Sequence, residues 1–265
     1  MDNSKKNKIY NVIRYAVMVV AICVFCYSAY ELISIYGEYR QGEDEYSSLS
    51  HVIFETKEHQ TYDTVESVDS DTTNETEEKE EFVFDYASLY NINQDAVGWI
   101  LIDGTSISYP MVQGSDNSYY LSHTINGTEN GAGTIFLDAR MERGFVSDNV
   151  IIYGHNMKNG TMFGELKKYN DENFYKKHNI INIFTEYEIC EYEVFAVAIV
   201  EPTDTMVYAY DLSDEEHFEQ YRNYINSIKL YDTNVNIYSD DKLITLSTCT
   251  SDSEQRLVVV AKKIN

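Results

Sequence analysis

The sequence predicts a mainly β fold, either a closed barrel or a sandwich, preceded by one membrane-spanning helix. Two observations predict the β fold. First, short runs of β-forming residues recur between residues 98 and 263 with turn residues between them. Second, only two segments in this region have the spacing of amphipathic helices, so strands predominate. A third observation predicts the membrane helix, because one long apolar run lies near the N-terminus.

Residues 1–14 form a basic N-terminus, and residues 15–36 form an apolar run with aromatic residues near its ends. This run is close to the ~20 residues that a spanning helix needs. Basic residues before it and acidic residues after it predict a single-pass plasma-membrane protein with a cytoplasmic N-terminus and an extracellular remainder. A cleaved signal peptide shares the charged start and apolar core, but no clear A-x-A-like site follows, which favours an uncleaved anchor.

Residues 37–81 are polar and acidic. Between residues 37 and 82 the chain carries fifteen Asp or Glu and three Lys or Arg. Such a stretch repels itself and buries little apolar surface, so we expect a disordered or loosely helical stalk; an acidic interaction tail is the alternative. The net charge of −24 and the pI near 4.4 argue against nucleic acid as a partner, because binding phosphate requires a basic face.

Residues 82–265 form the predicted globular domain. Asp85 is expected to cap a short helix at 86–91, and a second short helix is expected at 161–169. A longer helix at 213–229, with Ser213 and Glu216 as a capping box, is inserted just before a C-terminal hairpin. The strands expected before that hairpin are 98–103, 107–113, 133–138, 149–154, 180–185 and 187–200.

The hairpin at 243–263 carries Cys249 at the end of its first strand and Arg256 at the start of its second. A thiolate near neutral pH needs a neighbouring cation, and arginine keeps its charge, so the pair suits a nucleophile beside a charge stabiliser. His155 ends the apolar run NVIIYGH, so a strand also delivers an imidazole with the pKa needed for proton transfer. The alternatives are an inert buried cysteine, a surface arginine and a structural histidine.

Other cysteines and histidines carry weaker signals. Cys190 lies in a strand-like run and is either a core residue or the disulfide partner of Cys249, whereas two further cysteines fall in the apolar run, Cys23 and Cys26. His123 follows the aromatic segment SYYLS, and four histidines lie in the stalk or in polar surroundings: His51, His59, His178 and His217. No His, Asp or Glu cluster has ligand spacing and no Gly-rich phosphate loop is present, so we expect neither metal nor cofactor.

Several segments together resemble one enzyme family. TLSTC at 245–249, followed by Arg256 and the strand RLVVVAKK, resembles the signature of sortases, the membrane-anchored cysteine transpeptidases of Gram-positive bacteria. The segments at 98–123, 133–138 and 151–169 and the helix before the last strands are similar to the class B branch. The resemblance covers residues 82–265, with the motifs in the same order and spacing.

This resemblance implies an eight-stranded sortase-type β-barrel with helical additions and a catalytic trio of His155, Cys249 and Arg256. It implies that the Cys249 thiolate attacks the Thr carbonyl of a C-terminal sorting signal on a surface protein, and that an amine of cell-wall peptidoglycan or its precursor resolves the thioester. Arg256 would hold the signal and stabilise the oxyanion, while His155 acts as acid and then base. By the same resemblance, the substrate-binding residues are Asn117, Leu121, Thr203, Tyr208, Ser247 and Thr250.

Two other hypotheses remain open at this point. The same fold acts as a cysteine peptidase if water resolves the thioester, or as a pilin polymerase if a pilin lysine does. A surface-displayed binding module is the third hypothesis, since the chain has 24 Tyr that a barrel could present to a ligand.

Overall fold

The computed structural model describes residues 3–56, 82–249 and 254–265, and it divides the chain into two compact units, Met1–Asp44 and Glu45–Asn265. Its helices are α1 Asn3–Ile53, α2 Tyr86–Ile92, η1 Tyr119–Leu121, η2 Leu166–Asn170, α3 Glu172–Tyr175 and α4 Glu215–Ile228. Its strands are β1 Phe54–Thr56, β2 Phe82–Phe84, β3 Ala96–Leu101, β4 Ser108–Val112, β5 Ile135–Leu137, β6 Asn149–Tyr153, β7 Ile180–Phe184, β8 Ile189–Val200, β9 Leu243–Cys249 and β10 Arg256–Lys263.

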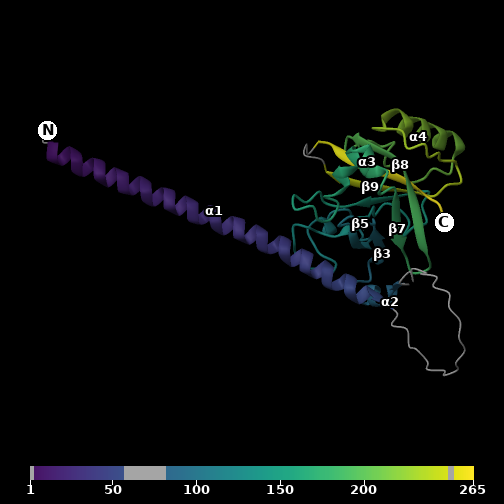
Figure 1. Ribbon diagram of the computed structural model, residues 1–265, viewed down its shortest axis with the longest axis horizontal. Helices are drawn as coiled ribbons and strands as arrows, with labels where there is room; N and C mark the ends of the chain where they lie inside the picture. The colour runs from purple at the N-terminus through teal and green to yellow at the C-terminus, as the bar shows by residue number, and fades with distance from the viewer. Residues whose placement is uncertain (1–2, 57–81, 250–253) are drawn as a thin grey trace, which may run out of the picture. The chain divides into compact units, whose positions relative to one another are not determined.

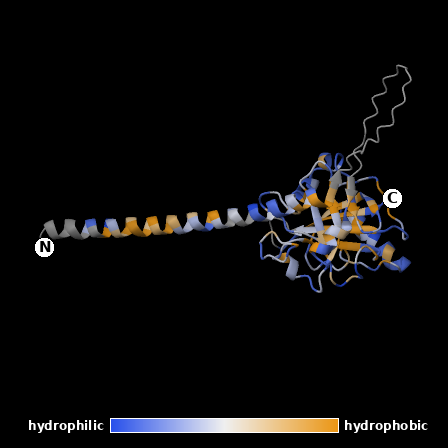
Figure 2. Ribbon diagram, turned by 90° about the horizontal axis from the view of Figure 1, so that it is seen from below, coloured by the Kyte–Doolittle hydropathy of each residue, from blue (hydrophilic) through white to orange (hydrophobic). Residues whose placement is uncertain are grey.

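Helix α1 contains the predicted membrane segment. Residues Ile13–Ser34 form a 22-residue stretch that is long and apolar enough to cross a membrane, and it begins and ends two residues earlier than the predicted 15–36. Figure 2 shows this stretch as a run of orange along α1. The stretch is consistent with a single-pass membrane anchor.

Helix α1 continues beyond the apolar stretch, which differs from the prediction of a single stalk at 37–81. Residues from Glu45 onward belong to the folded unit, where Tyr46, Leu49 and Ile53 are buried. These three side chains follow a helical spacing among polar neighbours, so one face of the helix packs inward. Strand β1 then pairs with β2. The rest of the predicted stalk, 57–81, lies outside the described residues.

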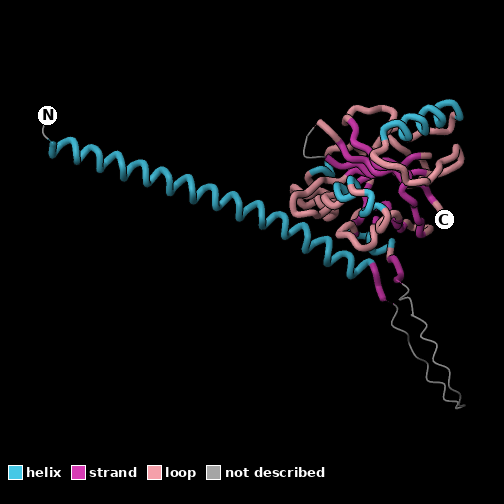
Figure 3. The backbone as a smooth tube through the Cα atoms, turned by 45° about the horizontal axis from the view of Figure 1, so that its top comes forward, coloured by secondary structure: helices cyan, strands magenta, loops and turns pink. Residues whose placement is uncertain are grey.

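The folded unit is the predicted closed barrel. Eight strands follow one another around it in the order β10-β8-β7-β3-β4-β5-β6-β9. Most neighbours are antiparallel, but β4 pairs with β5 in parallel and β6 pairs with β9 in parallel. Figures 1 and 3 show these strands gathered together in the folded unit. Its buried core is rich in hydrophobic side chains from β3, β6, β8, β9 and β10.

Helix α4 packs against the barrel. In the sequence it lies between β8 and β9. Phe218, Tyr221 and Ile225 recur on one face and pack with Val258 and Val260 of β10. The N-cap of the helix is Asp214, one residue after the predicted Ser213, because the Asp214 side chain accepts from the backbone N–H of His217. The hydroxyl of Ser213 is engaged elsewhere, since it donates to Asp211.

The two shorter predicted helices had different outcomes. Helix α2 begins after Asp85, whose side chain accepts from the backbone N–H of Ser88, and this cap was predicted. No α-helix forms across the predicted 161–169. Met162 has φ = +53°, which a right-handed helix does not contain, so the chain makes turns there before η2 and α3.

Cys190 is a buried core residue with a free thiol. It lies at the start of β8, whereas Val200 at the other end of β8 pairs with Arg256. Because Cys249 also pairs with Arg256, Cys190 and Cys249 lie at opposite ends of the barrel strands. This geometry excludes the disulfide between them and confirms the core interpretation.

Candidate active site

Three strand ends meet at one edge of the barrel. β6 and β9 run parallel with Tyr153 paired to Ser247, and the backbone N–H of Gly154 donates to the Ser247 carbonyl at 3.2 Å. The parallel pairing ends at the pair of Tyr153 and Ser247, which lies two residues before His155 on one segment and two residues before Cys249 on the other. β10 lies on the other side of β9, where Arg256 is the antiparallel partner of Cys249. Cys249 and Arg256 are therefore cross-strand neighbours at the barrel edge where β6 ends shortly before His155.

The glycine before His155 is required by packing. A Cβ atom on Gly154 would lie 2.5 Å from Ile135 Cδ1 and 2.6 Å from Phe163 Cδ2, well inside contact distance. The chain then turns sharply, and the His155 carbonyl accepts from the backbone N–H of Phe163 at 2.9 Å. The absence of a side chain at Gly154 thus lets β6 end against Phe163 and hold His155 at the barrel edge.

A backbone carbonyl fixes the imidazole of His155. Its Nε2 lies 2.7 Å from the Leu121 carbonyl oxygen. A carbonyl only accepts hydrogen bonds, so Nε2 carries the hydrogen in this contact. In the neutral ring the lone pair then lies on Nδ1, which becomes the atom that takes and returns a proton.

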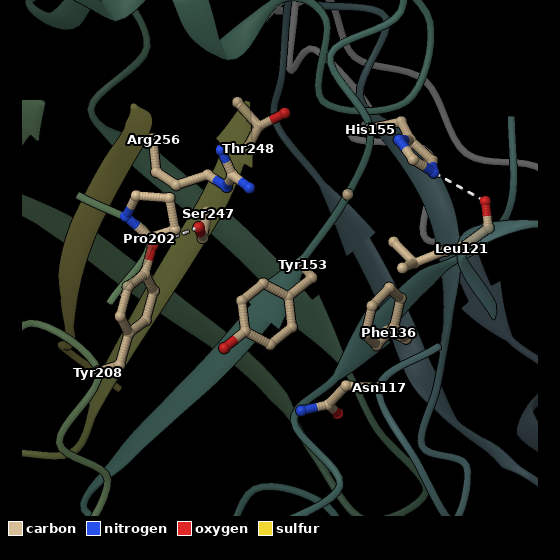
Figure 4. Close-up of a pocket in the computed structure, with 11 residues that line it drawn as sticks. Asn117, Leu121, Phe136, Tyr153, His155, Pro202, Tyr208, Ser247, Thr248 and Arg256 are labelled. Carbon is tan, nitrogen blue, oxygen red and sulfur yellow. Dashed lines mark hydrogen bonds between the residues drawn. The ribbon is translucent and has the colours of Figure 1, made fainter. Parts of the chain in front are cut away.

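His155, Arg256 and Leu121 line a pocket of about 260 Å³. Figure 4 shows His155 and Leu121 on one side of it, Arg256, Ser247 and Tyr208 on the other, and Tyr153 between them. The Tyr208 hydroxyl lies 2.9 Å from Ser247 Oγ, so the loop after β8 is tied to β9 at this pocket. The other lining residues are Asn117, Phe136, Gly154, Pro202 and Thr248.

A buried carboxylate supports one wall of the pocket. Asp138 accepts from Asn117 Nδ2 at 3.0 Å and from the Tyr153 hydroxyl at 2.9 Å, and Arg140 donates to both of its oxygens. Burial alone raises a carboxyl pKa, but the hydrogen bonds from Arg140, Asn117 and Tyr153 outweigh it and hold the pKa of Asp138 at about 2. Asp138 is therefore ionised at neutral pH.

Asn117 has both ends of its amide engaged. Its oxygen accepts from the backbone N–H of Ala139 at 2.7 Å, and one hydrogen of its Nδ2 goes to Asp138. The second Nδ2 hydrogen is the group that Asn117 can offer to a bound molecule.

Most of the predicted site residues meet at this pocket. His155, Arg256, Asn117, Leu121, Tyr208 and Ser247 line it. Thr203 does not, because it lines a separate pocket with Asp204 and Tyr224 beside α4. Thr250 lies outside the described residues, and for Cys249 the structure describes the backbone. Among the described residues, no group of three His, Cys, Asp or Glu side chains could hold a metal ion.

Sequence reasoning missed Phe136 and Tyr153. They form a cross-strand pair between β5 and β6, and Tyr153 pairs in turn with Ser247, so a row across three strands forms the pocket floor. The available signal was positional: Tyr153 lies two residues before His155, just as Ser247 lies two before Cys249. The strand pairing that makes this signal meaningful does not follow from the sequence.

Comparison with known proteins identifies the family. A model of the sortase domain matches residues 100–264. Sortase B of Listeria monocytogenes is 37% identical over 180 residues, which cover 66% of this chain and 72% of the relative. The chain belongs to the sortase family.

Solved sortase structures share the fold. Sortase B from B. anthracis in complex with AAEK1 matches with a TM-score of 0.70 and 31% identity, covering 87% of this chain and 99% of that one. The Staphylococcus aureus sortase B–substrate complex matches with a TM-score of 0.64 and 34% identity, covering 68% of this chain and 84% of that one. This sortase is thus a cysteine transpeptidase of the class B type, and the family acts on proteins that carry sorting signals.

Proposed function

We propose that this sortase cleaves a C-terminal sorting signal after Thr through a thioester on Cys249 and transfers the protein to an amine of peptidoglycan or its precursor. The observation that carries the proposal is the strand arrangement: Cys249 ends β9, which runs parallel to the strand that precedes His155, and Cys249 pairs with Arg256. Family membership supports the reaction class.

In the first step the thiolate of Cys249 attacks the scissile carbonyl, forming a C–S bond and moving the carbonyl electron pair to oxygen. The guanidinium of Arg256 stabilises both the thiolate and this oxyanion, because its charge is permanent. When the C–N bond breaks, the leaving amine takes its proton from Nδ1 of His155. Nδ1 is the reacting nitrogen because Nε2 is held by the Leu121 carbonyl.

In the second step the acceptor amine attacks the thioester carbonyl. His155 Nδ1 now takes the proton of the incoming amine, an amide bond forms, and the C–S bond breaks to return the thiolate. The same nitrogen therefore acts as acid and then as base, and no net proton is gained or lost by the enzyme over one cycle.

The pocket between Asn117 and Tyr208 is the proposed site of the sorting signal. It offers apolar surface from Leu121 and Phe136 and polar groups from Asn117, Ser247 and Tyr208. Such a mixture suits a peptide with both apolar and amide side chains. Thr203, in the neighbouring pocket, and Thr250 stay in the proposal as residues that contact the ends of a longer peptide.

The proposed location follows from the N-terminus. Basic residues precede Ile13–Ser34 and acidic residues follow it, which favours a cytoplasmic N-terminus and a catalytic unit on the extracellular face of the plasma membrane. There the enzyme meets secreted proteins and cell-wall precursors.

The test is mass spectrometry of products formed by the full chain in detergent with a library of sorting-signal peptides and either a glycine-type or a diaminopimelate-type amine. We expect a peptide cleaved after Thr and joined to the amine, with no product from Cys249→Ala. His155→Ala and Arg256→Ala should lower kcat by about a hundredfold or more, as losses of general acid–base and oxyanion groups do.

Two outcomes would contradict the proposal. Full cleavage by Cys249→Ala would exclude the thioester. Cleavage that yields free acid alone with every amine supplied would make the enzyme a peptidase, whereas joining to a lysine side chain in preference to either cell-wall amine would make it a pilin polymerase.

A further inference from the structure

The end of helix α1 reaches the loop that leads to the active site. Tyr46 is buried, and its hydroxyl donates to the backbone carbonyl of Gly133 at 2.5 Å. The same oxygen lies 3.1 Å from the hydroxyl of Thr134. One residue earlier, Glu45 accepts from the side chain of Asn126 at 2.8 Å. Helix α1 therefore contacts the loop 122–134 both at its middle, through Asn126, and at its end, through Gly133 and Thr134.

Gly133 is in backbone contact with Leu121. Its φ of +60° lies in the left-handed region, and a Cβ atom there would lie 2.4 Å from the Tyr120 carbonyl oxygen and 2.9 Å from the Leu121 carbonyl oxygen. The backbone N–H of Thr134 also donates to the Tyr120 carbonyl at 2.9 Å. The position of the Leu121 carbonyl thus depends on where Gly133 and Thr134 lie.

A second path of bonds runs through Thr134. Its side chain is buried, and its hydroxyl donates to the His123 carbonyl at 2.8 Å. This bond closes the base of the loop just after Leu121. Tyr46 therefore contacts both residues, Gly133 and Thr134, that hold the segment 120–123 in place.

The Leu121 carbonyl is the partner of His155 Nε2 at 2.7 Å. Two residues, Gly133 and Leu121, therefore lie between the phenol of Tyr46 and the imidazole of His155. We propose that Tyr46 is a positioning residue of the catalytic site: by holding Gly133, it keeps the Leu121 carbonyl on Nε2 and so keeps Nδ1 as the reacting nitrogen. This inference rests on the proposed role of His155.

A consequence is that the active site is incomplete without residues next to the membrane segment. Tyr46 lies in the same helix as the candidate span Ile13–Ser34, and it precedes the residues 82–265 in which the catalytic sequence motifs lie. A chain that begins at residue 82 lacks this phenol, although it keeps His155, Cys249 and Arg256.

The test compares Tyr46→Phe with Tyr169→Phe in the full chain in detergent. Tyr169 is a matched control, since it is also buried and also donates to a backbone carbonyl at 2.5 Å, that of His178. We expect Tyr46→Phe to lower kcat for peptide cleavage about fivefold, the effect of losing one neutral hydrogen bond. Tyr169→Phe should lower thermal stability without this loss of kcat.

A spectroscopic measurement separates positioning from stability. In ¹⁵N-histidine-labelled protein, His155 should carry its hydrogen on Nε2, and Tyr46→Phe should increase the share of the Nδ1–H tautomer. Thr134→Val, which removes the hydroxyl between Tyr46 and the His123 carbonyl, should change kcat and tautomer in the same direction and serves as the second variant.

The outcomes distinguish this inference from the proposed function. If Tyr46→Phe and Tyr169→Phe have equal kcat and the same His155 tautomer, Tyr46 is structural and the inference is wrong, while the trio stands. If His155→Ala retains activity, the proposed function is wrong, and the positioning role is lost with it.

Discussion

The phenol of Tyr153 donates to the carboxylate of Asp138 at 2.9 Å, and this carboxylate has no exposed surface. Tyr153 ends β6 and lines the pocket, whereas Asp138 follows β5 and lies behind it. Burial raises the pKa of Tyr153, so the phenol stays neutral and donates. One buried anion thus orients two pocket residues, Tyr153 and Asn117.

Asp138→Asn should destabilise the enzyme, most clearly at neutral pH. The pKa of Asp138 is about 2 in the folded protein, against an ordinary 3.8. A lowered pKa means that the ionised form stabilises the fold; this contribution is fully present above pH 3.8 and is lost as the pH falls toward 2. Its size is about 2 kcal/mol, and the amide also leaves Arg140 facing a donor.

Urea unfolding at pH 7 and at several values between pH 4 and 2 measures this effect. The free energy of unfolding of the wild type should fall through that window more steeply than that of Asp138→Asn. The exposed Asp240 provides a control, because Asp240→Asn should follow the wild-type curve. Parallel curves for Asp138→Asn and wild type would show that this carboxylate does not stabilise the fold by ionising.

Gly154→Ala should impair catalysis more than it impairs folding. The added methyl carbon would lie 2.5 Å from Ile135 Cδ1 and 2.6 Å from Phe163 Cδ2, whereas ordinary contacts are 3.4 Å or longer. Relieving this overlap costs about 1–3 kcal/mol of stability and moves the end of β6. Because His155 is the next residue, we expect kcat to fall at least tenfold at a temperature where the variant is folded.

Circular dichroism and peptide cleavage on the same sample check the Gly154 prediction. Gly37→Ala is its control, since a Cβ at Gly37 in α1 meets no atom within 4 Å. Wild-type kcat in a folded Gly154→Ala protein would mean that the strand end is free to shift without displacing the imidazole.

Tyr208 and Ser247 should act as one unit in substrate binding. Their oxygens lie 2.9 Å apart at the pocket, so Tyr208→Phe and Ser247→Ala each break the same contact. In a double-mutant cycle on the KM of the sorting peptide, we expect a coupling energy of about 1 kcal/mol. The control cycle combines Ser247→Ala with Tyr224→Phe. Tyr224 lines the separate pocket beside α4, so the effects of these two substitutions on KM should add without coupling.

Many of the strands could be predicted from the sequence because local patterns of apolar residues determine them. The alternation at the start of β8 and the apolar runs of β6, β9 and β10 predict strands. His155 just after β6 and Cys249 at the end of β9 predict a shared sheet edge. The family resemblance added the strand number and the closed barrel. Parallel pairing of β6 with β9, which ends two residues before His155 and two residues before Cys249, has no local signature.

The Asp138 network could not be predicted, since its partners are spread over Asn117, Arg140 and Tyr153. An aspartate after a short strand is typical of a turn residue, and only the closed barrel turns it into a buried anion. Thr203 lies outside this pocket for a related reason: the chain makes a turn at Pro202 and Thr203, and these two neighbours in sequence line different pockets.

The boundary of the folded unit was the largest difference, and it leads to a final prediction. Residues 37–81 are acidic on average, which conceals the helical spacing of Tyr46, Leu49 and Ile53. Ile53 is 0% exposed, and the next residue, Phe54, packs edge-on against Trp99 and Phe184 at ring distances of 5.4 and 5.1 Å. This end of α1 is therefore part of the hydrophobic core.

Ile53→Ala should lower the free energy of unfolding by about 2–4 kcal/mol, because it removes a fully buried side chain and leaves a cavity. Val52 is the matched control in the same turn of helix. It is 56% exposed, and Val52→Ala should change stability by less than about 0.5 kcal/mol, since alanine also favours the helix. Urea unfolding of the full chain in detergent, followed by the fluorescence of Trp99, measures both. Equal stability of the two variants would place this segment outside the cooperative unit, and the boundary at residue 82 would then be correct.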